Sequence, residues 1–439
     1  MEKTGKTIGI VERIALSCDA FTTGFSCMLV LFFLPYAAQY SYTAVLCVVP
    51  LACILPFVVM PVLYAVIHRT DFLLFGRYHL VMPVSAFCSA LFFVFVFSST
   101  AVGAGGACFI LFGAVLLSVA LPLYRYCAYS VRVRLGGDGV IGGSRATGVF
   151  SAIGAAATVG VFVGFYYYDA GAAYLNTSYV LGAASLILAL FQYLTTYYGI
   201  PRLGGKRVQP IKSVFITLFR GIDGRVFSCV LLFDAAFLAA AALVVYACVV
   251  LGAGVYIGVA CAAALVVAFF ATSIILSKFF ADKRTRLYAI AFVALFLGAA
   301  LCAIAMVVPV GEQAASAMLG IGAAFIGASG SAAMRQTRVR LVSVKPDITS
   351  GIAFLLFELI ILAAMGIALS VGAATATVFT FTFSRYAVFG GFCCAIALSI
   401  SAISIAAHKS VRAYKPRRVT YEPYAEITED RMGRTSNDE

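Results

Sequence analysis

The sequence predicts an all-α membrane protein in which twelve transmembrane helices form two six-helix bundles, arranged as a parallel repeat. Three observations predict this class: the composition, the spacing of long apolar segments, and the distribution of Lys and Arg between the loops. Of the 439 residues, 63% are hydrophobic and only 11% are charged, whereas about 25% of the residues in a soluble protein are charged. Too few polar side chains are present to cover a water-facing surface, which excludes a soluble enzyme and a soluble nucleic-acid-binding protein.

The apolar residues fall into segments long enough to cross a bilayer. A spanning helix needs about 20 predominantly apolar residues, because ~30 Å of hydrocarbon is crossed at about 1.5 Å per residue. The predicted spans of the first half are Ile14–Tyr36, Tyr42–Ile67, Leu80–Ser99, Ala107–Tyr129, Ala146–Tyr168 and Ser178–Tyr198. Those of the second half are Val226–Leu251, Val255–Ser277, Leu287–Val310, Ala314–Met334, Gly351–Ala374 and Tyr386–Ala407. The first span is too long for the apolar part of a cleaved signal peptide.

The basic residues give the orientation. With the N-terminus placed inside, all but one of the 31 Lys and Arg fall on the cytoplasmic side, and Arg385 is the exception. Cytoplasmic loops are enriched in Lys and Arg, and one missed helix would invert every later loop. The distribution therefore supports twelve spans with both termini in the cytoplasm. We expect an integral protein of the plasma membrane, which is the cell inner membrane of a bacterium.

The longest interior loop separates the two predicted bundles. We assign residues 1–200 to the N-terminal six-helix bundle, 201–225 to a cytoplasmic central loop and 226–407 to the C-terminal six-helix bundle. Residues 408–439 form a cytoplasmic tail that begins basic and ends acidic. We expect its basic part to lie against anionic lipid headgroups and the rest to be disordered.

An internal repeat supports the division. The tetrapeptide Arg-Val-Arg-Leu follows span 4 at Arg132–Leu135 and span 10 at Arg338–Leu341. Asp19 in span 1 has a counterpart in Asp234 of span 7. An even number of spans gives both halves the same orientation, which is the parallel repeat of secondary transporters that bind substrate between their halves. The expected mechanism is rocker-switch alternating access, in which the two halves tilt about a central site.

The loop after span 8 resembles a family signature. Ala281–Arg286 is similar to the loop of the major facilitator superfamily, in which Asp, a basic residue, any residue, Gly and a basic residue occur in that order, with Thr285 in place of the Gly. The resemblance implies the major facilitator fold. It also implies a conformational latch at the inner face, formed by Asp282, Lys283 and Arg286.

A narrower resemblance concerns the first two spans. Glu12–Tyr36 resembles span 1 of the glycoside–pentoside–hexuronide cation symporters, the melibiose permease group. His68–Tyr78 resembles the Asp-Arg-Thr…Gly-Arg loop of that group, with His68 in the Asp position. The resemblance implies cation-coupled sugar transport. However, span 2 lacks the group's acidic pair, span 11 lacks its lysine, and only Asp19 matches the cation site.

Ionisable residues within the spans are the candidate site. A charge at the centre of a spanning helix costs about 2.5–3.5 kcal/mol on insertion scales, so such groups usually face a cavity or a partner. We expect Asp19, Asp234 and Glu358 to lie on a substrate or proton pathway, together with Arg125 and the neighbouring Tyr124.

Each assignment has a structural alternative. Arg13 could neutralise Asp19, and Arg225 could neutralise Asp234. Arg125 could belong to the inner belt of basic residues, and tyrosines at such positions often anchor a helix at the membrane interface.

The leading function is therefore secondary active transport of a small polar solute, such as a sugar or a related metabolite, with or without coupling to protons. Its expected partners are the lipid bilayer, the solute and protons, with no nucleic acid, cofactor or metal; the chain is expected to act as a monomer. Two alternatives remain: efflux of an amphipathic drug or lipid by the same fold, and a transport-inactive membrane scaffold. An enzyme is not expected, because the interior ionisable residues do not cluster in sequence.

Overall fold

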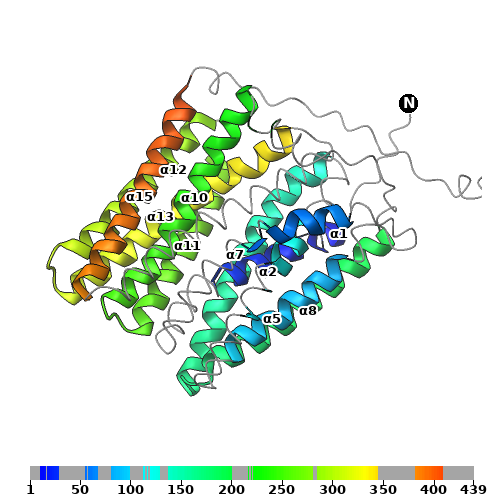
Figure 1. The fold of residues 1–439 in the computed structure, drawn as a ribbon, viewed down its shortest axis with the longest axis horizontal. Coiled ribbons are helices and arrows are strands. Elements are labelled where there is room, and N and C mark those ends of the chain that lie inside the picture. The colour runs from blue at the N-terminus through cyan, green and yellow to red at the C-terminus, as the bar shows by residue number, and fades with distance from the viewer. Residues whose placement is uncertain are drawn as a thin grey trace, which may run out of the picture.

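The part of the chain that the computed structural model describes is built mainly from long α-helices (Figure 1). It describes the helical parts of the chain within residues 10–28, 55–67, 81–98, 112–128, 137–199, 216–279, 284–344 and 381–408, apart from a few positions inside these ranges.

The N-terminal helices include one interrupted span. The backbone N–H of Ser17 donates to the carbonyl oxygen of Ile14 at 2.9 Å, a tight turn that separates the first two helices within predicted span 1. Two further helical stretches are shorter, Val58–Ile67 and residues 119–128. The helices of this part are α1 (Ile10–Ala15), α2 (Cys18–Met28), α5 (Val81–Ser98), α7 (Gly137–Tyr168) and α8 (Ala173–Gly199).

The C-terminal helices begin with a hairpin. Its turn needs a glycine, because Gly252 has a φ of 69°, a conformation that other residues rarely adopt. The N–H of Ala253 closes the end of the first helix by donating to the carbonyl oxygen of Cys248 at 2.9 Å. The helices of this part are α10 (Gly221–Val250), α11 (Val255–Phe279), α12 (Arg284–Val307), α13 (Glu312–Val344) and α15 (Phe381–Ala407).

These helices confirm the predicted class. Seven of those described, α7, α8, α10, α11, α12, α13 and α15, are long and apolar enough to cross a bilayer. One difference is that α13 continues to Val344, so Arg338–Leu341 is helical where the sequence predicted a loop. Predicted span 11, Gly351–Ala374, lies outside the described residues.

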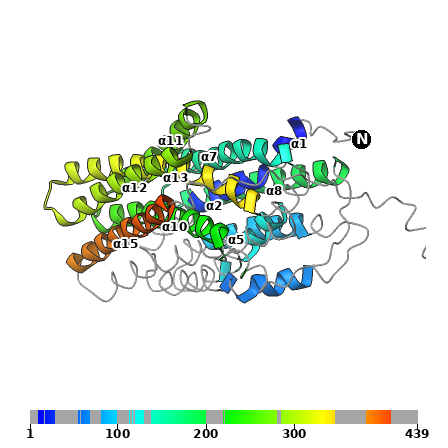
Figure 2. The same ribbon diagram turned by 90° about the horizontal axis from the view of Figure 1, so that it is seen from above.

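The helices form two groups that lie side by side (Figures 1 and 2). In one group α2 packs on α7 and α8, and α5 packs on α8; in the other, α10, α11, α12, α13 and α15 pack on one another. The groups meet where α7 contacts α11 and α13. At the α7–α11 contact, the rings of Tyr166 and Tyr256 are T-shaped with centroids 5.5 Å apart. The residue boundaries of the two predicted bundles stay a prediction.

Glycines let several helices approach closely. A side chain at Gly24 of α2 would overlap the backbone of Ser151 in α7, and one at Gly154 of α7 would overlap the backbone of Phe21. In the second group, Gly327 of α13 meets the backbone of Leu265 in α11 in the same way. Small residues at such crossings are typical of helices that associate within a bilayer, where close contact replaces the hydrophobic effect as the driving force.

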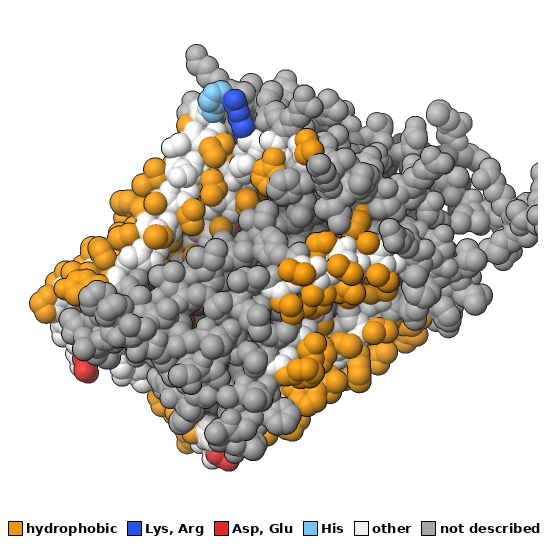
Figure 3. Space-filling model, viewed as in Figure 1, with side chains coloured by type: hydrophobic (Ala, Val, Ile, Leu, Met, Phe, Trp, Pro, Cys, Tyr) orange, Lys and Arg blue, Asp and Glu red, His pale blue; other side chains and the backbone are white. Residues whose placement is uncertain are grey.

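The surface also fits a bilayer. On the face in Figure 3, apolar side chains cover the long sides of the helices, while the coloured acidic and basic side chains lie at the two ends. Exposed apolar residues on α8 include Ile187, Leu190 and Leu194. Contact with lipid costs these side chains little free energy, because the hydrocarbon is as apolar as they are.

Candidate functional site

Two of the predicted acids are deeply buried. Asp19 lies in the first turn of α2 with 3% of its surface exposed, and Asp234 lies in α10 with 1% exposed. Asp19 lies in the first predicted span of the N-terminal bundle, and Asp234 lies in the first predicted span of the C-terminal bundle. The structure therefore places both carboxyl groups inside the protein and away from the lipid-facing surface.

The orientation of α2 turns Asp19 away from α7. Phe21 and Gly24 face α7, the helix that meets α11 and α13. At about 100° per residue, Asp19 lies roughly 140–160° around the helix from these two positions but only about 60° from Thr22. Thr22 contacts α8. Asp19 is therefore on the side of α2 that turns away from α7.

Two hydrogen bonds join α8 to its neighbours. The hydroxyl groups of Thr22 and Ser185 lie 2.7 Å apart, and both side chains are buried. The hydroxyl of Tyr124, in the helix of residues 119–128, donates to Oε1 of Gln192 at 2.5 Å, and both residues are fully buried. Ser185 and Gln192 are seven residues apart, so they share one face of α8. Between them on that face lies Ala189, which is also buried.

Asp19 precedes Thr22 by one turn of α2, about 4.5 Å along the helix. Gln192 is about 10.5 Å along α8 from Ser185. We refer to Asp19, Thr22, Tyr124, Ser185 and Gln192 as the N-terminal polar group. The arrangement provides hydroxyl, amide and carboxyl groups within an apolar bundle, which suits proton transfer or recognition of a polar solute.

The surroundings of Asp234 are different. One turn further along α10, the ring of Phe237 packs against Gly330 of α13. Phe233, the residue immediately before Asp234, stacks on Tyr288 of α12 with ring centroids 5.5 Å apart. The phenylalanines before and after Asp234 on α10 thus pack against α12 and α13.

The predicted basic partner of Asp234 lies elsewhere. Arg225 is about 13 Å along α10 from Asp234. Its guanidinium is exposed and lies 3.3 Å from Nδ1 of His408, at the end of α15. The structure thus favours a role for Arg225 at the end of the bundle.

The remaining predicted site residues are Arg125, Glu358 and the three residues of the latch. Arg125 follows Tyr124 and is partly buried. Glu358, Asp282 and Lys283 lie outside the described residues, as does the side chain of Arg286, so the conformational latch stays a prediction.

Sequence reasoning missed three members of the N-terminal polar group: Thr22, Ser185 and Gln192. A signal for two of them was present, because Ser178, Ser185 and Gln192 recur every seven residues on one face of an otherwise apolar helix. Within the described ranges, no group of three or more His, Cys, Asp or Glu side chains could hold a metal ion.

No protein-family profile and no curated protein sequence matches this chain. Solved structures do match. A bacterial homologue of the iron transporter ferroportin, in an outward-facing state, aligns with a TM-score of 0.60 at 13% identity over 90% of this chain and 99% of its own. The nucleoside transporter NupG aligns with a TM-score of 0.57 at 13% identity over 90% and 99%. The major facilitator superfamily transporter FucP, in the outward conformation, aligns with a TM-score of 0.55 at 15% identity over 89% and 98%.

These alignments extend over nearly the full length of each solved chain. They do not test the resemblance to the melibiose permease group, which stays a prediction. At 12–15% identity the similarity defines the fold. The chain therefore has the fold of the major facilitator superfamily of transporters.

Proposed function

We propose that the protein is a secondary active transporter that moves a small polar solute by rocker-switch alternating access, with Asp19 as the proton carrier. The observation that carries the proposal is the N-terminal polar group: a buried carboxyl group one helical turn from the buried Thr22–Ser185 hydrogen bond, within a transporter fold.

The chemistry of the structural neighbours supports a polar solute. One solved structure is described as the Escherichia coli fucose:proton symporter FucP, which aligns with a TM-score of 0.50 at 12% identity. Others are a nucleoside transporter and a bacterial homologue of human drug and peptide transporters. Sugars, nucleosides and peptides all carry several hydrogen-bonding groups. A carrier for such a solute needs buried polar side chains, as this chain has around Asp19.

The cost of burying charge supports proton coupling. An ionised carboxylate in a low-dielectric interior is costly, whereas the protonated, neutral form is compatible with burial. Proton uptake at Asp19 would therefore lower the barrier for moving the loaded site across the membrane. The hydroxyl group of Thr22, one turn along α2 from Asp19, could donate to the ionised form when the site is open to water.

The remaining predicted residues complete the proposal. Asp234 would be a second buried proton-binding group in the other helix group, and Glu358 a third on span 11. Arg125 would bind an anionic part of the solute near Tyr124. The loop residues Asp282, Lys283 and Arg286 would hold the inner face closed in one state of the cycle.

Uptake into proteoliposomes under an imposed pH gradient tests the proposal. The vesicles would be supplied with radiolabelled fucose, uridine or alanylalanine as probes, with internal pH reported by a trapped dye. We expect one class of probe to accumulate together with protons. Asp19→Asn should reduce gradient-driven accumulation at least about tenfold but preserve exchange without a gradient. Asp169→Asn is the matched control, because Asp169 is an exposed acid in the turn before α8.

Two results would change the assignment. Full accumulation by the Asp19→Asn variant would remove Asp19 as the proton carrier. Expulsion of an amphipathic dye, without movement of any polar probe, would favour the efflux alternative.

A further inference from the structure

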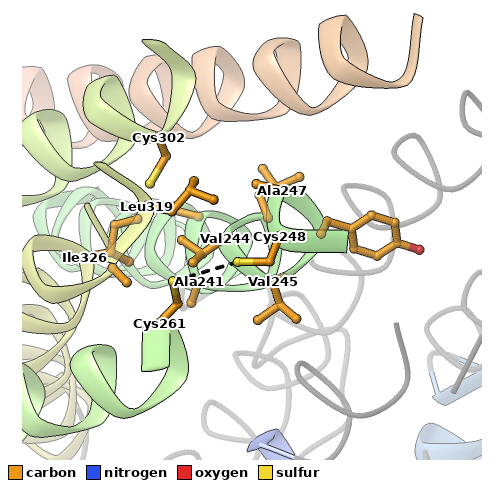
Figure 4. Close-up of a cluster of buried hydrophobic side chains, with 14 of the residues drawn as sticks. Ala241, Val244, Val245, Ala247, Cys248, Cys261, Cys302, Leu319 and Ile326 are labelled. Carbon is orange, nitrogen blue, oxygen red and sulfur yellow. Dashed lines mark hydrogen bonds between the residues drawn. The ribbon is translucent and has the colours of Figure 1, made fainter. Parts of the chain in front are cut away.

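Two cysteine thiols face each other in the α10–α11 hairpin. Sγ of Cys248, near the end of α10, lies 3.8 Å from Sγ of Cys261 in α11 (Figure 4). Both side chains are buried, and both are free thiols. A separation of 3.8 Å is van der Waals contact between the sulfur atoms, so only a short movement separates them from the ~2.05 Å of a disulfide.

The surroundings allow that movement. Figure 4 shows Ala241, Val244, Val245 and Ala247 around the two sulfur atoms, all from α10. These four side chains are short and aliphatic, so a change of thiol rotamer would displace small groups. Cys302 of α12 belongs to the same cluster, but its sulfur is directed at Gly322 of α13. The facing pair is therefore Cys248 and Cys261, with Cys302 as a bystander.

Cys248 lies near the exposed end of the hairpin. Cys248 precedes the hairpin turn at Leu251 by three residues, about 4.5 Å along the helix. Gly252 and Gly254 in the turn are exposed, and so is Tyr256, the first aromatic residue of α11. A small uncharged oxidant could therefore reach Cys248 through fluctuations of the end of the hairpin, whereas a protein oxidant could not.

We propose that Cys248 and Cys261 are a redox-sensitive modification site that closes to a disulfide under peroxide. Hydrogen peroxide oxidises one thiol to a sulfenic acid and is itself reduced to water. The second thiol then attacks the sulfenic sulfur, the S–S bond forms, and its proton leaves with the hydroxyl group as a second water. A soluble dithiol reverses the reaction by exchange and becomes the oxidised partner.

Burial selects the disulfide as the product. Further oxidation of the sulfenic acid would give a sulfinic acid, which is ionised and costly in an apolar cluster. The disulfide carries no charge and needs no hydrogen bond. Because the second thiol is already in contact, its attack is intramolecular and competes well with a second molecule of peroxide.

Peptide mapping of the full-length protein tests the proposal. The protein would be purified with a reductant, desalted, treated with dilute hydrogen peroxide in detergent micelles, alkylated under denaturing conditions and digested. We expect a peptide pair linking Cys248 to Cys261, lighter by two hydrogen atoms than the sum of the free peptides and separated by dithiothreitol. Thermal unfolding of the oxidised protein should shift to higher temperature, because the cross-link restricts the unfolded chain.

Alanine variants provide matched controls. Cys248→Ala and Cys261→Ala should each abolish the linked pair and the thermal shift, and alanine suits a cluster already rich in this residue. Cys302→Ala should leave both intact. The exposed Cys393 and Cys394 of α15 report whether oxidant is present, because they are accessible without facing the pair. Persistence of free Cys248 and Cys261 while Cys393 or Cys394 is oxidised would overturn the proposal, as would a link that includes Cys302.

Discussion

The two helix groups of this chain differ in the contacts that their described helices make. In the N-terminal group, hydrogen bonds between side chains of different helices join α2 to α8 and α8 to residues 119–128. In the C-terminal group, the described contacts between helices are mainly aromatic and aliphatic, with a thiol–carbonyl contact from Cys229 to Ala402 at 3.3 Å. The buried Ser329 and Ser399 donate to carbonyl oxygens of their own helices. Among the described contacts, side-chain hydrogen bonds between buried residues of different helices are thus a feature of the N-terminal group.

This difference suggests separate tasks. A buried inter-helix hydrogen bond has a strict geometry, so it fixes the register of two helices more sharply than aliphatic contacts do. The N-terminal group would then bind and orient the solute. The C-terminal group, with α10 at its centre, would move as a packed body. The α7–α11 contact, where Tyr166 meets Tyr256, is one place where the two bodies touch.

The largest expected loss of stability tests the close helix crossings at glycine, which both groups contain. Gly24→Val and Gly327→Val each force a side chain into the backbone of a neighbouring helix, α7 and α11 respectively. Overpacking typically costs about 1–3 kcal/mol, and a backbone obstacle places both variants at the upper end. Unfolding followed with a thiol-reactive dye, which reports the exposure of buried cysteines, should show a large loss of thermal stability in both.

Gly160→Ala is the control, because nothing lies within 4 Å of the position that a Cβ atom would occupy. It should be neutral or slightly stabilising, since alanine favours a helix. A loss of stability in Gly160→Ala as large as in Gly24→Val would mean that close packing is not what glycine provides in α2.

The next-largest expected loss of stability concerns a hydrogen bond within the N-terminal group. Tyr124→Phe removes the donor to Gln192 and leaves a buried amide oxygen without this hydrogen bond. Hydrogen bonds between membrane helices contribute up to about 1.7 kcal/mol, and we expect this short, buried one to lie near that limit. Tyr256→Phe, in the α7–α11 contact, keeps its T-shaped ring contact and has an exposed side chain, so it should cost little. The same dye assay measures both variants.

A double variant sharpens the result. If loss of the Tyr124–Gln192 hydrogen bond causes the destabilisation, Gln192→Leu should lower the stability less in the Tyr124→Phe background than in the wild type. Additive losses would assign the effect of Tyr124→Phe to packing alone.

The sequence predicted the fold well and the site only in part, for a physical reason. Bilayer thickness sets the length of each span, so apolar segments alone located α10, α11, α12 and α15 to within a few residues. The cost of a buried charge likewise singled out Asp19 and Asp234, which are both buried. However, the contact between Thr22 and Ser185 joins residues 163 positions apart. Which helices meet depends on side-chain packing in three dimensions, and hydropathy does not encode it.

The smallest expected loss of stability tests whether a hydrogen bond between two helices contributes more than one within a single helix. Thr22→Val keeps the shape of the side chain but removes the hydroxyl that contacts Ser185, and such inter-helix bonds average about 0.6 kcal/mol in double-variant cycles. Ser399→Ala removes a hydroxyl that bonds only within its own helix among the described contacts, to Ile396 at 2.7 Å, so a smaller loss is expected. A cycle of Thr22→Val with Ser185→Ala should show coupling, whereas Ser399→Ala with Ser185→Ala should be additive because the residues lie in different groups. Equal and uncoupled losses would mean that Thr22 and Ser185 do not fix α2 against α8, and the polar group would then lose its structural role while Asp19 could still carry protons.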